Sequence, residues 1–526
     1  MFADIFGSIT LLKALSAIVV MVFIVFVNAA VLKPWKILSL YSKLPGSIVR
    51  FKIGGKVMKI TRNVKKWSQN EKSTQKTSSE GTCPHLSSKV YEDVYEYSDT
   101  RFLAENIVMI PLIKLTDPAL IAEYYKNPKA YYKYQPRTCL THLRYSLGGS
   151  EGERWRVMRK TISEAFHFES LRKIIPLMED TIKEKFATYK SNEPEYSVLI
   201  EIQKITGEVV GRSFFGERLN DYKINGKELI VELADLTISN SKLLRNPLYQ
   251  VFGDIAMIWS AEFRKCKRDS IAFTEFVREI MKKTIIRIKN GETNNGDGRK
   301  GILQLLVERT EDPLTEDELL GNFINFFLAG TDTSGHHLAM ITYFLIKHPE
   351  IKEKLVKDID AHWDGKSRLS FEIIQKMDYM QAVIDEAFRL AAPVPNITPR
   401  KALVDHFIKD IPIKKGTMVT PHFLKSNFNS NLYKDRDVFR PERWIKGDDA
   451  YERPSDPFAF IPFSAGGRNC IGQHFSVVEM KIFLCHFLKT FEFDLAPGSP
   501  EIEMVLKFLI EPQNPVVFSL KRKQNI

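Results

Sequence analysis

The sequence is poor in cysteine, and the few cysteines that it has are scattered. Its 526 residues contain five, namely Cys83, Cys139, Cys266, Cys470 and Cys485, and no two of them form a CxxC pair. Zinc ribbons and thioredoxin-type redox sites are therefore excluded. An odd and dispersed set also argues against a disulfide framework and indicates a reducing compartment. A cysteine that takes part in chemistry here must act alone or with a cofactor.

The sequence also lacks an internal repeat, a clear linker in its globular part, and any flavin- or dinucleotide-binding motif. Its hydrophobic share of 44% and charged share of 27% are ordinary for a globular protein, which excludes a disordered chain. We expect one large mixed domain over residues 83–526, preceded by a basic and polar segment over 34–82 and a membrane anchor over 1–33. Electrons for any redox chemistry would have to come from another protein.

Acidic residues are missing from one stretch. Residues 33–66 contain ten Lys or Arg and no Asp or Glu, whereas the rest of the chain carries 66 basic and 64 acidic residues. The net charge of +12 is therefore concentrated in this stretch. Nucleic-acid binding is one interpretation of a basic stretch, but the segment before it favours a membrane surface.

That preceding segment is a long apolar run. Residues 14–32 are interrupted only by Ser16 and Asn28, and as a helix they would span roughly 28 Å, close to the hydrocarbon thickness of a bilayer. The basic flank that begins at Lys33 then predicts that everything after it faces the cytoplasm. The alternative is a cleaved signal peptide, whose apolar run is shorter and whose leading segment is basic. We expect a retained anchor.

Helical patterns dominate from residue 117 to 390. A strand is predicted over 107–115, a short strand over 418–421 and a helix after Gly472. The clearest helix starts with a capping box at Thr315–Glu318, is apolar over 319–346 and ends before Pro349. Because it is about thirty residues long, roughly 45 Å, and so apolar, it must be buried on most faces.

The middle of this helix is small and polar, with the sequence Ala329-Gly330-Thr331-Asp332-Thr333-Ser334. Small residues leave space beside a helix, and hydroxyl groups can bond back to carbonyls and widen a turn. Taken alone, the segment is explained as well by a kink, or by a glycine that permits close packing.

One cysteine lies in a glycine-rich loop before a predicted helix. The segment is Phe463-Ser464-Ala465-Gly466-Gly467-Arg468-Asn469-Cys470-Ile471-Gly472. Its glycines allow a tight loop, and the following helix N-terminus favours a thiolate at Cys470. Phe463 can shield the sulfur from water, and Arg468 can pair with an anionic cofactor edge. These features suit thiolate ligation of haem iron.

The loop resembles the haem-binding loop of the cytochrome P-450 family, Phe-x-x-Gly-x-Arg-x-Cys-x-Gly, at all five fixed positions. Three other segments agree with that family in order and spacing. They are the Glu-x-x-Arg helix at Glu386–Arg389, the segment Pro441–Trp444 that contains Arg443, and the Trp-x-x-x-Arg helix at Trp155–Arg159. The resemblance implies a buried triad of Glu386, Arg389 and Arg443 that holds the cysteine loop in place.

The resemblance implies a mainly α fold with a smaller β region, the triangular helical prism of the cytochrome P-450 fold around haem b, with an N-terminal transmembrane helix. It makes Cys470 the iron ligand. The other residues implied to bind the cofactor are Arg468, Phe463, Trp155, Arg159, Ala329 and Gly330. The sequence departs from the family pattern at Ser476, commonly Ala, and at Trp444, usually Phe. Arg400 is a further candidate for a propionate contact, although its spacing is one residue too long.

The implied reaction is monooxygenation of a lipophilic small molecule by dioxygen. Thr333 would place its hydroxyl beside the bound oxygen, and Asp332 would relay protons. The implied partners are an NADPH-cytochrome reductase and the lipid bilayer of the endoplasmic reticulum, with the catalytic domain in the cytoplasm and no nucleic acid. Residues that suggest an apolar cavity are Phe326, Phe327, Val394, Ile397 and Leu509, and those that suggest a basic docking surface are Arg154, Arg156 and Lys160.

Two other functions stay open. A haem-thiolate isomerase or dehydratase needs no reductase, but such enzymes often lack the acid–alcohol pair that Asp332 and Thr333 form here. A haem sensor or carrier without catalysis has no need of a proton relay. Consumption of NADPH with reductase and substrate would exclude the sensor.

Overall fold

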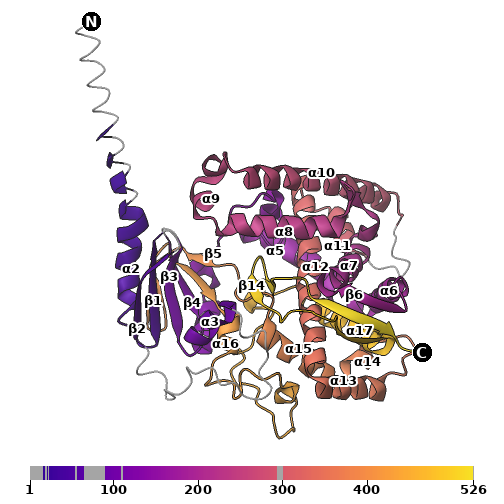
Figure 1. The fold of residues 1–526 in the computed structure, drawn as a ribbon. Helices are drawn as coiled ribbons and strands as arrows, with labels where there is room; N and C mark the ends of the chain where they lie inside the picture. Colours follow the sequence, from indigo (N-terminus) through magenta and orange to yellow (C-terminus); the bar gives the residue numbers. More distant parts are fainter. Residues whose placement is uncertain are drawn as a thin grey trace. The chain divides into compact units, whose positions relative to one another are not determined.

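The computed structural model describes residues 16–17, 20–21, 23–25, 27–53, 56–63, 89–107, 110–292 and 300–524. The chain folds into two compact units, each assembled from separate stretches of sequence (Figure 1). The sheet unit comprises residues 1–75, 96–134 and 396–426. The helical unit comprises residues 76–95, 135–395 and 427–526.

The sheet unit is built on seven strands in the order β2-β1-β3-β4-β12-β9-β5. β3 and β4 form an antiparallel hairpin, and β4 runs parallel to β12 on its other side. The strand predicted over 107–115 is observed at 110–115, and β12 has the predicted bounds. The described elements are α2 (Lys33–Tyr41), β1 (Ser47–Ile53), β2 (Lys56–Asn63), β3 (Phe102–Ile107), β4 (Ile110–Leu115), α4 (Pro118–Lys126), β5 (Tyr131–Lys133), β9 (Arg400–Ala402), β10 (His406–Ile408), β11 (Ile411–Ile413) and β12 (Met418–Pro421).

The helical unit contains most of the helices and three small sheets, ordered β13-β16-β6, β14-β15 and β7-β8. Two helices, α3 (Lys89–Tyr97) and α16 (Phe423–Asn427), cross a unit boundary. The other elements are α5 (Gly152–Ser163), α6 (Phe168–Ala187), β6 (Asn192–Ser197), α7 (Val198–Val210), β7 (Lys223–Ile224), β8 (Lys227–Glu228), α8 (Leu229–Arg245), α9 (Pro247–Phe252), α10 (Ala261–Lys289), α11 (Ile302–Val307), α12 (Glu316–Lys347), α13 (Pro349–His362), α14 (Phe371–Gln375), α15 (Asp378–Ala391), α17 (Gln473–Thr490), β13 (Phe491–Leu495), β14 (Met504–Leu506), β15 (Ile510–Pro512) and β16 (Val517–Arg522).

The long helix predicted from the sequence is α12, and it lies at the centre of the helical unit (Figure 1). The predicted capping box is present, because the Thr315 hydroxyl accepts the N–H of Glu318 and the Glu318 carboxylate accepts the N–H of Thr315. The helix packs against α7, α15, α10 and α17. Its burial and its unbroken helical conformation confirm the prediction of an enclosed helix.

One face of α12 is open. From Leu320 to Leu345 every residue is buried except Asn325, Ala329, Gly330 and Thr333. Positions four apart share a helix face, so these residues form one strip, which we call the open strip. A helix that is enclosed everywhere else therefore borders a space along this strip.

Most of the predicted anchor over 1–33, and residues 64–82 of the predicted basic and polar segment, lie outside the described residues. In the part of the chain that the structure does describe, no helix is long and apolar enough to cross a membrane.

Candidate active site

The cysteine loop holds Cys470 between a short helical turn at Gly466–Arg468 and the start of α17. Gly466 has a φ of +70°, a left-handed conformation that suits glycine. The N–H of Cys470 donates to the carbonyl oxygen of Phe463 at 2.9 Å, which closes the loop. The backbone N–H of Gly472 donates to the Cys470 sulfur. The sulfur is thus fixed directly before a helix N-terminus.

The electrostatics at this sulfur contain opposing contributions. Burial raises the pKa of the Cys470 thiol, and the Gly472 N–H and the positive charge of Arg159 partly offset that rise. A backbone donor that favours the thiolate is therefore present, as expected. A metal ion bound by the sulfur would favour the thiolate further.

The donor set around Cys470 indicates what kind of metal fits. Within the described ranges, no group of three or more His, Cys, Asp or Glu side chains could hold a metal ion. A metal bound at Cys470 must therefore bring its other ligands with it. Haem iron would do so, because the porphyrin brings its own nitrogen ligands and the protein would need to add only one more, the sulfur of Cys470.

The surroundings of Cys470 leave room for such a group. Burial raises the pKa of the Cys470 thiol, so protein surrounds the sulfur, yet the residue keeps exposed surface. Ala329 on the open strip is likewise exposed, although it lies in the middle of an enclosed helix. Both observations indicate internal space next to the cysteine loop and next to α12.

Aromatic contacts connect the cysteine loop to α12 at one end of the open strip. A Cβ built on Gly472 would lie 3.9 Å from the Cys470 sulfur and 3.9 Å from the ring of Phe166. The Phe166 ring stacks on that of Phe326 in α12, with centroids 6.1 Å apart. Phe166 therefore joins the loop to the helix.

A second connection lies at the other end of the strip. The Phe463 ring packs edge-on against Phe388 at 5.0 Å, and Phe388 stacks on His337 of α12 at 3.5 Å. Phe326 and His337 are about 16 Å apart along the helix axis. Ala329, Gly330 and Thr333 of the open strip lie between these two connections. The space between loop and helix therefore suits a flat macrocycle, and the residues present fit haem.

Three of the predicted cofactor residues lie together beside the loop. The Arg159 guanidinium donates to the carbonyl and side-chain oxygens of Asn469, at 3.0 and 2.7 Å. The Arg468 guanidinium lies 3.9 Å above the Trp155 ring and pairs with Glu151 at 2.9 Å. Their predicted contacts with haem propionates stay predictions. Asn469 was missed by the sequence analysis, although it directly precedes the cysteine.

Arg400, the remaining propionate candidate, belongs to β9 of the sheet unit. Its guanidinium lies 5.6 Å from the centre of the Tyr124 ring in the same unit. Its role at a cofactor stays a prediction.

On α12, the predicted acid–alcohol pair has two different environments. The Thr333 hydroxyl lies on the open strip and donates to the carbonyl of Ala329 at 2.7 Å, as expected for a hydroxyl that bonds back. Asp332 is buried, and one of its carboxylate oxygens accepts the Gln203 amide at 3.1 Å. Burial raises the pKa of Asp332 to about 6, against the lowering effect of His336.

Gly330 is used for packing. A Cβ at this position would lie 2.6 Å from a methyl group of Val210, so the glycine lets α7 approach α12 closely. This is the packing explanation that the sequence analysis left open. The small residue that lies exposed on the open strip is Ala329.

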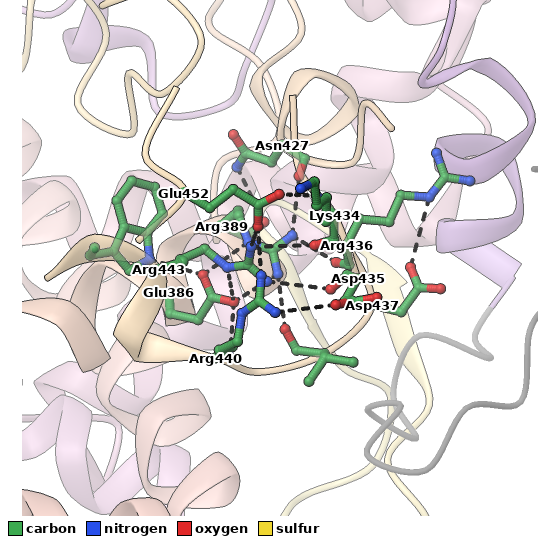
Figure 2. Close-up of polar contacts among 12 residues, drawn as sticks. Glu386, Arg389, Asn427, Lys434, Asp435, Arg436, Asp437, Arg440, Arg443 and Glu452 are labelled. Carbon is green, nitrogen blue, oxygen red and sulfur yellow. Dashed lines mark hydrogen bonds and ion pairs between the residues drawn. The ribbon is translucent and has the colours of Figure 1, made fainter. Parts of the chain in front are cut away.

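The implied ion-pair triad is present and buried (Figure 2). The Arg389 guanidinium donates to both carboxylate oxygens of Glu386, at 2.9 and 2.8 Å, and Arg443 donates to one of them at 3.0 Å. Two partners were not predicted. The Trp444 indole N–H donates to Glu386 at 2.9 Å, and Glu452 pairs with Arg443 at 2.5 Å. The unusual Trp at position 444 thus supplies a donor that Phe lacks.

The predicted basic docking surface on α5 is smaller than expected. Arg154 pairs with Glu318 at 2.5 Å and with Asp312 at 2.6 Å, so its charge is neutralised. Arg156 is exposed and pairs with Glu153 at 2.7 Å, and Lys160 is exposed. The docking role of these side chains stays a prediction.

Known proteins resemble this chain in sequence and in fold. The family model described as Cytochrome P450 matches residues 101–518. The chain is 26% identical over 438 residues to Cytochrome P450 3A5 of Homo sapiens, covering 78% of this chain and 82% of the relative. It is 28% identical over 359 residues to Cytochrome P450 monooxygenase mpsF of Macrophomina phaseolina, covering 65% of this chain and 82% of that one.

Solved structures show the same fold. The retinoic acid bound cyanobacterial CYP120A1 matches with a TM-score of 0.68 and 22% identity, over 80% of this chain and 92% of that one. The cytochrome P450DA heme domain matches with a TM-score of 0.67 and 20% identity, over 81% and 90%. The predicted fold class, mainly helical with a smaller β region, is confirmed. Because the family match spans most of its length, the chain belongs to the cytochrome P450 family, which carries haem b and catalyses monooxygenation.

Proposed function

We propose that this enzyme inserts one atom of dioxygen into a lipophilic substrate at a membrane surface, with electrons from an NADPH-dependent reductase. The observation that carries the proposal is the open strip of α12, on which the Thr333 hydroxyl lies. Asp332 directly precedes Thr333, and aromatic contacts join this helix to the Cys470 loop. An acid next to an alcohol beside that space is suited to delivering protons.

In this proposal Cys470 would hold the haem iron. Phe463, Trp155, Arg159 and Arg468 would border the cofactor on the loop side, and Ala329 and Gly330 would border it on the helix side. Haem held by a thiolate supplies oxygen activation, because the electron density of the sulfur favours O–O cleavage. The chain's part is to position groups around it and to move protons.

The proton path ends at Thr333. Its hydroxyl lies on the open strip, where it can hold a proton next to bound oxygen. Asp332, one residue earlier, is out of contact with solvent and has a pKa of about 6 as a result of burial. A carboxyl group with a pKa this close to neutral can both take up and release a proton.

An apolar substrate is supported by the side chains at the end of the strip. Phe326 packs with Phe166 and Phe214, and Phe214 in turn contacts Phe475. Burying apolar surface against such rings stabilises a bound lipophile by about 25 cal/mol per Å². Of the other candidate cavity residues, Val394 and Ile397 keep partly exposed surface, whereas Phe327 and Leu509 are buried.

Electron delivery is proposed at the exposed face of α5. Arg159 on this helix contacts the cysteine loop, and Arg156 and Lys160 on the same helix are exposed. A reductase with an acidic surface would bind there. Changing Lys160 to Glu should raise the reductase concentration needed for half-maximal turnover, with the carbon monoxide spectrum unchanged.

We also propose membrane association at the endoplasmic reticulum, with the catalytic part in the cytoplasm. Exposed apolar side chains support the contact with a membrane. In the N-terminal part these include Phe23 and Ile24. In the helical unit, Ile255 and Trp259 between α9 and α10 are 83% and 89% exposed. Exposed apolar groups of this size mark membrane or protein contacts. Flotation of the full-length chain with liposomes tests the proposal, and a chain that stays in the aqueous fraction would contradict it.

The test of the reaction uses the full-length holoenzyme with reductase, NADPH and a lipid extract. Substrate-induced changes in the haem spin state select a candidate, and turnover follows under isotopically labelled dioxygen. We expect one labelled oxygen atom in the product and NADPH consumption. Product formed without any electron donor would favour an isomerase and contradict the proposal.

A further inference from the structure

A buried charge pair lies one helical turn from Asp332. His336 follows Asp332 by four residues on α12, and Glu511 is the middle residue of β15. The Nε2 atom of His336 lies 2.7 Å from a carboxylate oxygen of Glu511. Both residues are buried in the helical unit, His336 at 5% and Glu511 at 7% exposure. Neither was singled out by the sequence analysis.

The contacts of His336 determine its charge. Its Nδ1 atom lies 2.7 Å from the carbonyl oxygen of Asp332, which can only accept, so Nδ1 carries a hydrogen and donates it. Its Nε2 atom faces the Glu511 carboxylate. When Glu511 is ionised, both ring nitrogens therefore face acceptors, an arrangement in which a positive charge on the ring is hydrogen-bonded at both ends. The ring is also fixed in orientation, because both nitrogens have partners.

Glu511 has a second cationic partner. Lys507, in the turn between β14 and β15, pairs with the other carboxylate oxygen at 2.7 Å and is partly exposed. Although burial alone would raise it, the hydrogen bonds from His336 and Lys507 hold the pKa of Glu511 below its ordinary value. Glu511 is therefore a carboxylate at neutral pH and faces the His336 ring as an acceptor.

The charged groups that act on the Asp332 carboxyl are few. His336 on the same helix favours its ionised form, and Glu511 on β15 opposes it. From α7 the Gln203 amide donates to it without carrying charge. Lys507 acts through Glu511. Of the two opposing effects, that of His336 is the larger.

We propose that the His336–Glu511 pair is a positioning element that keeps Asp332 ionisable at neutral pH, by holding one positive charge a helical turn from a carboxyl group that burial would otherwise keep protonated. His336 acts through Asp332 and does not pass the proton on itself, because its Nδ1 hydrogen is directed to a peptide oxygen. The expected change in turnover rests on the proposed function, whereas the expected change in the ionisation of Asp332 does not.

The test replaces His336 by Gln in the full-length holoenzyme. A unit charge one turn away changes a pKa by about one to two units at an effective dielectric constant near 20. We expect the acidic limb of the pH profile of product formation to move upward by about one pH unit. The loss should be largest near pH 6 to 7 and should shrink at higher pH.

A second measurement does not depend on turnover. The infrared C=O stretch of a protonated carboxyl group, assigned to Asp332 by its loss in Asp332→Asn, should persist to higher pH in His336→Gln than in the wild type. The double variant His336→Gln with Glu511→Gln should reverse part of this shift, because it also removes the negative charge that opposes ionisation of Asp332. A role in packing alone predicts no such reversal.

The matched control is His348→Gln. His348 follows α12, about 18 Å along the helix axis from His336, and also faces a glutamate, Glu350, at 3.3 Å. Its replacement should leave the pH profile and the infrared band as in the wild type.

The inference is overturned if the Asp332 carboxyl band of His336→Gln disappears at the same pH as in the wild type. It is also overturned if this band disappears at a higher pH in the double variant than in His336→Gln. Failure of the wild type to consume NADPH would overturn the proposed function instead, and the infrared titration would still decide the role of His336.

Discussion

The replacement of Glu386 by Gln tests the buried charge cluster most severely. Glu386, Arg389 and Arg443 have no exposed surface, and the Glu386 carboxylate accepts five hydrogen bonds from the Arg389, Arg443 and Trp444 side chains and the Arg440 N–H (Figure 2). The variant keeps the shape of the Glu386 side chain and removes its negative charge. The guanidinium groups of Arg389 and Arg443 then remain close together without the carboxylate that both of them bind.

The expected cost follows from what each arginine retains. Arg389 still donates to the carbonyls of Asn427, Arg436 and Val438, and Arg443 still pairs with Glu452. Breaking a buried ion pair by removing one partner costs about 3–5 kcal/mol. Because a typical domain has only about 5–15 kcal/mol of stability, most of the variant should lose haem or aggregate.

The pH dependence of this cluster has a definite sign. Although burial alone would raise it, the two arginines hold the pKa of Glu386 below its ordinary value of 4.5. The stability that comes from the ionised form is present above that value and is lost as the pH falls through the lower folded-state pKa. The wild type should therefore destabilise on acidification below about pH 4.5, and Glu386→Gln should lack this contribution.

The assay is urea denaturation followed by tryptophan fluorescence, with haem content measured on the same samples. The control is Glu353→Gln on α13, whose exposed pair with Lys357 should be dispensable. Full haem occupancy and an unchanged midpoint in Glu386→Gln would refute the structural role of the triad.

Three further predictions concern single side chains. Trp444→Phe removes the indole donor to Glu386 and should cost about 1–3 kcal/mol in the same denaturation assay; an unchanged midpoint would mean that the hydrogen bond adds nothing. Thr333→Ala should still bind haem, substrate and carbon monoxide but form less product and more hydrogen peroxide per NADPH, and an unchanged ratio would remove the proposed role of the hydroxyl. Asp332→Asn removes a carboxyl group whose pKa is raised from 3.8 to about 6. The free energy of unfolding of the variant, relative to the wild type, should therefore increase between these two pH values, by about 3 kcal/mol in total above pH 6. A difference between variant and wild type that does not change with pH would contradict a buried carboxyl group.

Much of the site could be predicted from the sequence because its signals are local. The cysteine loop, the capping box of α12, and the pairing of Glu386 with Arg389 depend on spacings of three to ten residues, which the backbone converts directly into geometry. The strand β12 was predicted with its observed bounds for the same reason.

The rest depends on contacts that spacing does not reveal. His336 could have been noticed, since it lies four residues from Asp332 on a predicted helix. Glu511 could not, because β15 is 175 residues away in sequence from its histidine partner. The raised pKa of Cys470 was missed because it comes from burial by many residues, whereas the sequence displays only the favourable donors of the loop.

The central claim is that the Cys470 thiolate is the protein ligand of the haem iron. In the reduced holoenzyme with carbon monoxide, we predict the red-shifted Soret band that marks thiolate ligation, and its loss in Cys470→Ala. Cys485→Ala, a buried cysteine on α17, is the control and should keep the band. Persistence of the band in Cys470→Ala would contradict the account.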